Sequence, residues 1–305
     1  MTGAATPEIA DVIIRREDAT ETQEGILLRA EQIIPYQNIA RKSEDTKAET
    51  LLLSAPIRCT PQIIALLATV GKSSFQVYKL PETAVVTTGD EIVDPSAVVN
   101  TFQIRNSNQY LLRSLLEQWN IRPVLCEHVN DDKFRLSASL SKALKADLVI
   151  INGAVSAGDA DHVPAVLQEL GVETLFHKVS IRPGKPLLVG KTASGTVVFA
   201  LPGNPLSCLT TFTVFVEHYL SVCNGFASRT FQTIPLLQDR TKKHPLTEFF
   251  PVKLNGSGEL NLLGFNGSGD VTACTQASGL GIHPANEPQL RQNQGINYYP
   301  FNHFQ

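Results

Sequence analysis

The stretch that decides the fold is residues 147–151, Asp-Leu-Val-Ile-Ile, which is the strongest strand signal in the chain. A second run, residues 83–88 (Thr-Ala-Val-Val-Thr-Thr), is also apolar and β-branched, and Gly89 ends it. Continuous apolar runs of this length are typical of strands that are buried on both faces, as in parallel sheets. We therefore expect a parallel sheet at the centre of the protein.

Segments with helical spacing alternate with further strand-like runs around these two strands. Residues 106–119 carry apolar side chains on one helical face, and Asn106, Ser107 or Asn108 is available as the N-cap. This β-α-β-α-β order predicts a three-layer α/β domain over residues 79–225, with helices on both faces of the sheet. The other elements we expect are strands at 122–128, 174–179 and 197–200, and helices at 133–144, at 161–170 and from Pro205 onward.

The segments before and after this α/β domain have a different pattern of apolar and polar residues. Residues 1–78 contain short β-like runs, such as 12–14 and 25–28, and one helix-like stretch at 61–70. Residues 226–305 lose the helical period and show short alternating runs with Asn-Gly and proline turn signals. We expect a partial N-terminal β-rich region before the α/β domain and a C-terminal β-barrel domain after it.

Composition and charge exclude several classes of protein. Of the 305 residues 43% are apolar, which is enough for a folded core. The net charge of -3 argues against a nucleic-acid or membrane-surface protein, and no apolar run reaches the roughly 18 residues of a membrane span. The five scattered cysteines lack metal-ligand or redox spacing, and the N-terminus has no secretion signal. A reduced, cytoplasmic location is the expectation.

Four polar or glycine-rich segments follow predicted strands or precede predicted helices, namely residues 88–91, 105–108, 152–161 and 201–207. In an open α/β sheet, ligands bind beyond the carboxyl ends of the strands. Because all four segments belong to that edge, we expect them to form one site. The chain has neither the Gly-Lys-Ser/Thr of a phosphate loop nor the Gly-x-Gly-x-x-Gly of a dinucleotide-binding turn.

The residue types in these segments favour a site for a metal ion and a phosphate. Gly153 and Gly158 allow a ligand to approach the backbone closely, helix N-termini attract phosphate, and Ser156 supplies a hydroxyl donor. Carboxylates are hard oxygen ligands that suit a Mg²⁺ bridging phosphate oxygens. The candidate ligands are Asp90, Glu91, Asp159 and Asp161.

The charge distribution supports an anion site at the same edge. Between Glu173 and Glu217 the chain has no acidic residue, whereas Lys178, Arg182 and Lys185 fall in this interval. Prolines on both sides of the Gly184-Lys185 pair stiffen the segment, which suits a positioned cation better than a solvated one. The sequence therefore predicts acidic loops beside a basic wall.

These segments resemble those of the molybdopterin molybdenumtransferase family, of the MoeA and gephyrin E-domain type. The family's Thr-Gly-Asp-Glu element is matched at residues 88–91, and its Leu-Pro-Gly-Asn-Pro-x-Ser element is matched in full at 201–207. Further similarity covers the glycine-rich loop at 153–161, the lysine and Pro-Gly-Lys-Pro element at 178–186, the helix start at 106–108, and flanking stretches at 1–4, 37–45 and 277–284. The resemblance thus extends over essentially the whole chain, whose α/β domain would be the MogA-like molybdopterin-binding domain.

The resemblance implies that molybdate is inserted into adenylyl-molybdopterin with release of AMP, and that Mg²⁺ is required. It also implies a cytoplasmic homodimer that acts on small molecules, with no nucleic acid or membrane as partner and with a molybdopterin adenylyltransferase as a candidate partner. Because Met1 falls inside a family motif, we expect an N-terminally truncated family member, without the helical segment and half of the β domain that precede this motif in the family.

Site roles are carried over onto the matching positions. Catalytic roles fall on Asp90, Asp159, Lys178 and Lys185, and metal binding on Glu91, Asp159 and Asp161. In a mechanism built on these roles, the loop from Gly153 to Gly158 contacts the adenylate and its phosphate together with Ser107. The cations Lys178, Arg182 and Lys185 bind molybdate and the pterin phosphate. The cofactor-binding set is Thr88, Gly89, Ser107, Asn108, Gly153, Val155, Ser156, Gly158, Arg182, Pro183, Gly184, Pro202, Gly203, Asn204 and Pro205.

Three departures from the family pattern keep other functions open. Asn106 replaces an acidic position, Ala154 replaces the second glycine of the loop, and Ser43 stands where glycine is usual. One alternative is a related nucleotide-binding enzyme with the same α/β domain, such as a molybdopterin adenylyltransferase or a CinA-like enzyme. A second is a catalytically weakened scaffold that binds partners through the fold, and a third is an inactive fragment with exposed β edges.

Overall fold

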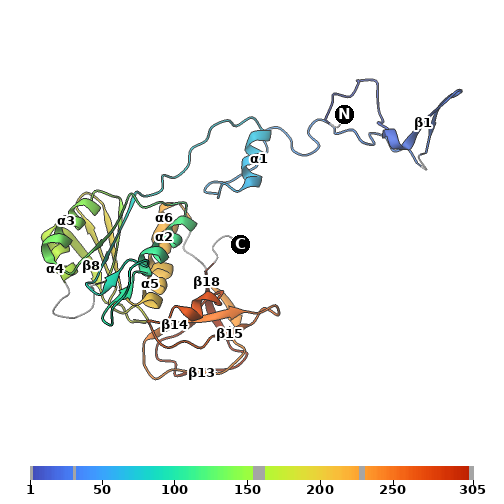
Figure 1. Ribbon diagram of the computed structural model, residues 1–305. Coiled ribbons are helices and arrows are strands. Elements are labelled where there is room, and N and C mark those ends of the chain that lie inside the picture. The colour runs from blue at the N-terminus through green and yellow to red at the C-terminus, as the bar shows by residue number, and fades with distance from the viewer. Residues whose placement is uncertain (1–2, 30–31, 154–161, 227–230, 302–305) are drawn as a thin grey trace. The chain divides into compact units, whose positions relative to one another are not determined.

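The computed structural model describes residues 3–29, 32–153, 162–226 and 231–301 (Figure 1). The chain divides into two compact units, residues 1–70 and residues 71–305. The expected boundaries at residues 78 and 225 stay predictions.

The first unit contains few regular elements. A 3₁₀ turn, η1 (Arg16–Asp18), leads into an antiparallel hairpin of β1 (Ala19–Thr22) and β2 (Gly25–Leu28). Helix α1 (Pro61–Thr69) begins where Thr60 accepts a hydrogen bond from the Ile63 N–H, as its Thr-Pro start favours. The run at 25–28 and the helix at 61–70 are confirmed, whereas residues 12–14 form no strand.

The second unit is built on a six-stranded sheet with the order β6-β3-β7-β11-β10-β8. The first four strands run parallel, as expected, but β10 is antiparallel to both of its neighbours. The expected central parallel sheet is thus confirmed, and β10 runs in the opposite direction because the four residues between β10 and β11 are too few for a parallel crossover. The strands are β3 (Thr83–Thr88), β6 (Leu125–Val129), β7 (Leu148–Asn152), β8 (Val172–His177), β10 (Leu188–Thr192) and β11 (Val197–Leu201).

Helices cover both faces of this sheet, which confirms the three-layer architecture (Figure 1). On one face α3 (Lys133–Ala143) and α4 (His162–Glu169) enclose a core that includes Val86, Val149 and Ile151. On the other face lie α2 (Asn108–Gln118) and a continuous helix made of α5 (Pro205–Thr211), the π-helical turn η2 (Phe212–Val216) and α6 (Glu217–Cys223). Alternate side chains of the buried strands therefore point into the two cores, which is why the sequence of these strands is apolar throughout.

The helix over residues 205–223 is long and apolar enough to cross a membrane by length and composition alone, with a mean hydropathy of 1.3. Within the protein, however, 61% of it is buried. Its apolar side chains, among them Phe212, Val216 and Leu220, pack in the core beneath the sheet. The hydropathy of this helix is therefore accounted for by its place in the fold.

The C-terminal part forms a second sheet with the order β12-β18-β16-β14-β15. A single bridge between Leu236 and Leu260 connects the two ends of this sheet, and the closed barrel stays a prediction. A short strand of the preceding segment, β9 (Ile181–Arg182), pairs in parallel with β14 and so joins the Pro-Gly-Lys-Pro loop to this sheet. The remaining elements are β12 (Gln232–Pro235), β13 (Arg240–Thr241), β14 (Thr247–Leu254), β15 (Leu260–Leu262), η3 (Thr272–Thr275), β16 (Gly279–His283), β17 (Gln289–Leu290) and β18 (Gly295–Pro300), and β4 (Ile92–Val93) pairs with β5 (Ile104–Arg105) before α2.

Candidate active site

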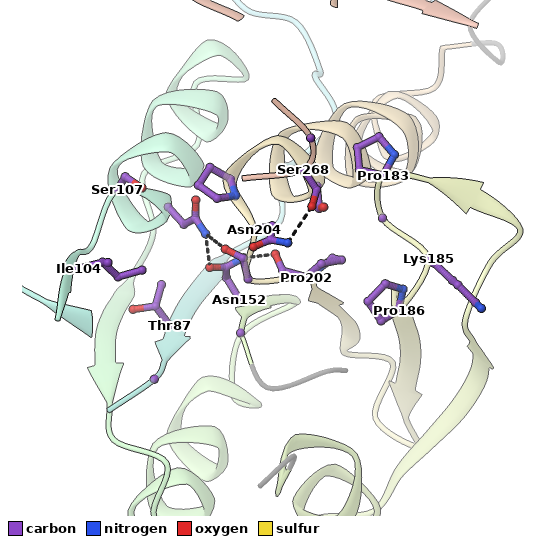
Figure 2. Close-up of a pocket in the computed structure, with 18 of the residues that line it drawn as sticks. Thr87, Ile104, Ser107, Asn152, Pro183, Lys185, Pro186, Pro202, Asn204 and Ser268 are labelled. Atoms are coloured by element: carbon purple, nitrogen blue, oxygen red, sulfur yellow. Dashed lines mark hydrogen bonds between the residues drawn. The ribbon is translucent and has the colours of Figure 1, made fainter. Parts of the chain in front are cut away.

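A pocket of about 910 Å³ lies at the carboxyl end of the parallel strands. This volume is within the usual range for a site that holds a small molecule. The wall combines the ends of β3 and β7, the start of α2, the loop at 181–186 and the turn at 202–205 with side chains from the C-terminal sheet (Figure 2). Topology therefore brings together segments that lie far apart in the sequence.

Two buried asparagines connect three of these segments. Asn108 Nδ2, at the start of α2, donates to Asn152 Oδ1 at 2.8 Å and to the Gly203 carbonyl at 2.6 Å. Asn152 Nδ2, at the end of β7, donates to the Pro202 carbonyl at 2.8 Å (Figure 2). Both side chains are more than nine-tenths buried. This amide pair fixes the turn before α5 against the sheet edge.

The start of helix α2 lines the pocket and is held by hydrogen bonds of a third asparagine side chain. Asn106 Oδ1 accepts from the Gln109 N–H at 3.2 Å, and its Nδ2 donates to Thr87 Oγ1 at 3.1 Å. A carboxylate at position 106 has no N–H, so it could hydrogen-bond to Thr87 only by accepting from the hydroxyl. Ser107 is exposed at the pocket, where its hydroxyl and the first N–H groups of the helix suit an anion.

Two glycines of the predicted set are required by the backbone. Gly153 has φ +107°, and a Cβ there would lie 2.5 Å from the Thr88 carbonyl oxygen. Gly184 has φ +109°, and a Cβ there would lie 2.5 Å from Thr211 Cγ2. Both positions are in or beside the left-handed region that side chains avoid, so the chain can turn this tightly only with glycine.

The predicted carboxylates do not all face the pocket. Asp90 Oδ1 accepts from Asn130 Nδ2 at 3.0 Å and from the Asp131 N–H at 3.1 Å, and these bonds lower the pKa of Asp90. Asp90 therefore holds the loop after β6, whereas Glu91 and Asp131 line the pocket. Thr88 Oγ1 donates to Asp131 Oδ1 and connects this loop to β3.

Only two of the three predicted cations line the pocket. Arg182 and Lys185 line the pocket, whereas Lys178 is exposed outside the lining. Figure 2 shows the Lys185 side chain pointing away from Asn152 and Asn204. Among the described lining residues the charges balance, since three cations (Arg105, Arg182 and Lys185) match three acids (Glu91, Asp131 and Glu248). The pocket lining therefore contains both positive and negative side chains.

Most of the predicted site residues come together in this pocket. Asp90 and Lys178 do not line it, and Val155, Ser156, Gly158, Asp159 and Asp161, with Ala154, lie outside the described residues. The roles assigned to all of these residues stay predictions. Those that line the pocket are Thr88, Gly89, Glu91, Ser107, Asn108, Gly153, Arg182, Pro183, Gly184, Lys185, Pro202, Gly203, Asn204 and Pro205.

Sequence reasoning missed a part of the wall that the C-terminal sheet and its loops supply. Ser268 Oγ accepts from Asn204 Nδ2 at 2.8 Å (Figure 2), and Glu248 lines the pocket from β14. Asn152 lies in the predicted segment 152–161 but was given no role, although a polar residue that ends a buried apolar strand is a usable signal. An acid between Thr247 and Phe249 in an apolar strand is a comparable signal for Glu248.

Three family models match consecutive parts of the chain. The MoeA N-terminal region (domain I and II) matches residues 1–71, the probable molybdopterin binding domain matches residues 84–221, and the MoeA C-terminal region (domain IV) matches residues 233–301. The matches on both flanks argue against the alternative enzymes that share only the α/β domain.

Individual relatives agree with these matches. A molybdopterin molybdenumtransferase of Staphylococcus aureus (strain Mu50 / ATCC 700699) is 34% identical, over 93% of this chain and 69% of the relative. One of Haemophilus influenzae is 29% identical, over 99% and 76% of the two chains. A crystal structure of a molybdopterin biosynthesis MoeA protein from Pyrococcus horikoshii superposes with a TM-score of 0.76 and 30% identity, over 98% of this chain and 74% of that one. On fold, pocket and sequence together, this chain belongs to the molybdopterin molybdenumtransferase family.

Proposed function

We propose that this protein transfers molybdenum from molybdate to molybdopterin, which is the activity named for its relatives. The observation that carries the proposal is the pocket at the carboxyl edge of the sheet, whose lining includes the start of α2 and the cations Arg182 and Lys185. Helix N-termini and guanidinium or ammonium groups are the elements that hold oxyanions in proteins. The pocket is also large enough for a pterin that carries a phosphate.

The proposed form of the second substrate is adenylyl-molybdopterin, with AMP as the leaving product. Gly153 and Gly203 contribute backbone to the pocket lining, and Ser107, with its hydroxyl, lines the same space. Such groups suit the phosphates of an adenylylated ligand. Cleavage of a phosphoanhydride needs stabilisation of the developing charge more than a protein nucleophile, so the cations act by position and charge.

The proposal also includes a Mg²⁺ ion at the pocket. Among the described residues no group of three or more His, Cys, Asp or Glu side chains is placed to hold a metal ion. Glu91 lines the pocket, and in the proposal it would hold Mg²⁺ together with Asp159 and Asp161, which lie outside the described residues. When bound, the ion would neutralise phosphate charge. Glu91→Gln should raise the Mg²⁺ concentration needed for half-maximal rate, and an unchanged Mg²⁺ requirement would remove Glu91 from the metal site.

The cellular setting follows from the same proposal. We propose a cytoplasmic homodimer that receives its substrate from a molybdopterin adenylyltransferase. Sedimentation of the purified chain measures the dimer, and co-purification with an adenylyltransferase measures the partnership. A monomer that releases AMP at full rate would remove dimerisation from the requirements for activity.

The test of the reaction is molybdate-dependent release of AMP from adenylyl-molybdopterin, measured by chromatography. Asp159→Ala and Lys185→Ala should each abolish AMP release while the melting temperature stays unchanged. Lys243→Ala, which removes a lysine that is not part of the pocket lining, is the matched control. Undiminished turnover in both site variants would refute the assigned roles, and no release by the wild-type chain would refute the proposed activity.

A further inference from the structure

The wall of the pocket that belongs to the C-terminal sheet contains a carboxylate whose task is not explained by anion binding. Glu248 is only 7% exposed, yet it lines the pocket from strand β14. A buried carboxylate is costly unless it is paired. In a site for phosphates and molybdate, a negative charge in the wall would also repel the ligand, so its presence points to another part of the ligand.

One oxygen of Glu248 is occupied and the other is available. Arg240 Nη1 lies 3.1 Å from Oε2, and His244 Nε2 lies 3.3 Å from the same atom. Oε1 has no hydrogen bond within the described part of the chain. The pairing thus stabilises the charge through Oε2 and leaves Oε1 free as an acceptor.

Arg240 is itself held rigidly. Its Cζ lies 4.0 Å from the centre of the Phe250 ring, and its Nη1 lies 2.9 Å from His283 Nδ1. Since a guanidinium only donates, His283 Nδ1 must accept, which places the imidazole proton on Nε2 toward the Glu287 carbonyl at 2.8 Å. Burial lowers the pKa of His283 and favours this neutral form. The carboxylate therefore has a fixed position before any ligand arrives.

The surroundings of Glu248 differ from the rest of the pocket. Ile181, Leu246 and Phe265 line the pocket together with this carboxylate. In the register of β9 and β14, the backbone of Glu248 lies opposite that of Arg182. A ligand that fits such a wall has an apolar, flat head with N–H donors at its edge, while its anionic part lies toward the sheet edge. The pyrimidine ring of a pterin has this character, because a ring N–H and an amino group stand side by side on one edge.

We propose that Glu248 is a specificity residue that recognises the pterin ring, with Oε1 accepting hydrogen bonds from the ring N–H and the adjacent amino group. Arg240 is the positioning residue that holds the carboxylate for this contact. The inference rests on the proposed function, since it assigns one end of the same pocket to the pterin part of the substrate.

The first test changes the ligand and leaves the full-length wild-type chain intact. Pterin (2-amino-4-oxopteridine) and lumazine (2,4-dioxopteridine) have nearly the same size, but lumazine carries an oxygen in place of the amino donor. Titration followed by pteridine fluorescence should give at least about tenfold tighter binding of pterin, as expected for a hydrogen bond to a charged group. Equal affinity for the two compounds would overturn the proposal.

The second test inverts the polarity of the pocket wall. Arg240 can only donate, so in Glu248→Gln the carboxamide oxygen takes the place of Oε2 and its NH₂ group faces the pterin donors. Pterin affinity should fall at least about tenfold while lumazine affinity stays the same or improves. Glu287→Gln is the matched control outside the pocket lining and should leave the preference for pterin unchanged. An unchanged preference in Glu248→Gln would overturn the assignment.

The outcomes separate this inference from the proposed function. Wild-type protein that releases AMP from adenylyl-molybdopterin but binds pterin and lumazine equally would refute the role of Glu248 alone. A clear preference for pterin without any molybdate-dependent AMP release would support the role of Glu248 and refute the transferase activity. If melting curves show that Glu248→Gln is unfolded, the comparison of ligands on the wild-type chain decides.

Discussion

The buried amide pair offers the sharpest test of how the site is held together. Asn152→Ala removes a donor to the Pro202 carbonyl and an acceptor for Asn108 Nδ2, both at 2.8 Å. Each hydrogen bond contributes about 1 kcal/mol net, and the buried Pro202 carbonyl, left without this donor, adds about another 1 kcal/mol. We therefore expect the free energy of unfolding to fall by about 3 kcal/mol.

Urea unfolding followed by circular dichroism measures this loss. A destabilisation of that size corresponds to a fall in melting temperature of roughly 6–12 °C for a unit of this size. Asn297→Ala is the control, since Asn297 is exposed on β18 and its side chain makes one 3.4 Å hydrogen bond to Thr233. That variant should lose less than about 0.5 kcal/mol.

A second substitution at the same position separates hydrogen bonding from packing. Asn152→Asp keeps the size of the side chain and the acceptor for Asn108, but it places a buried carboxylate oxygen against the Pro202 carbonyl. It should destabilise the protein at least as much as Asn152→Ala does, because an unpaired charge is more costly to bury than a small cavity. If Asn152→Asp lies within about 0.5 kcal/mol of wild type while Asn152→Ala is destabilised, packing and not hydrogen bonding holds the turn.

Three further changes test other parts of the structure. Gly153→Ala places a Cβ 2.5 Å from a backbone oxygen of β3 and should cost more than about 2 kcal/mol in urea unfolding, whereas Gly264→Ala, with open space around it, should cost less than about 1 kcal/mol; equal losses would contradict the steric argument. Since the pKa of His283 is lowered in the folded protein, its contribution to the free energy of unfolding is fully present above about pH 6.5 and is lost as the pH falls. His283→Gln should flatten this pH dependence of the free energy of unfolding, and an unchanged pH dependence in the variant would refute the role of His283. Lys185→Ala should weaken molybdate binding, measured by equilibrium dialysis, more than Lys178→Ala, and the reverse order would contradict the lining of the pocket.

The sequence predicted the parts of the fold that depend on local pattern. The run at 83–88 and residues 148–151 of the second run lie in strands buried along their whole length, because apolar and β-branched side chains fill both faces. Strand β10 was missed, since Gly190 interrupts its apolar run and Lys191 and Thr192 end it. Its antiparallel direction follows from the short connection to β11, and strand direction has no local sequence signature.

The part of the site that sequence could not supply depends on a long-range pairing. Strand β9 has only two residues and β14 has eight, and they lie more than sixty residues apart in the chain, yet their parallel pairing places Glu248 next to Arg182. A motif describes residues that are close in the chain, so it identified the sheet-edge half of the pocket and left out Glu248 and Ser268. An acid within an apolar strand marks Glu248 as unusual, but only the tertiary structure places it and Ser268 at the pocket.

This division has a consequence for how the site discriminates between ligands. The sheet-edge half offers backbone N–H groups, amides and cations, which bind any phosphate or oxyanion of suitable size with little regard for the group attached to it. The C-terminal half contributes a carboxylate held by Arg240 and apolar neighbours, which distinguish donors from acceptors on a ring. Recognition of the head group therefore arises in β14, whereas anion affinity arises at the edge of the α/β sheet and in the neighbouring strand β9 and the loop after it. Substitutions in β14 should change which ligand is chosen, whereas substitutions at the ends of β3 and β7 should change how tightly every anionic ligand is held.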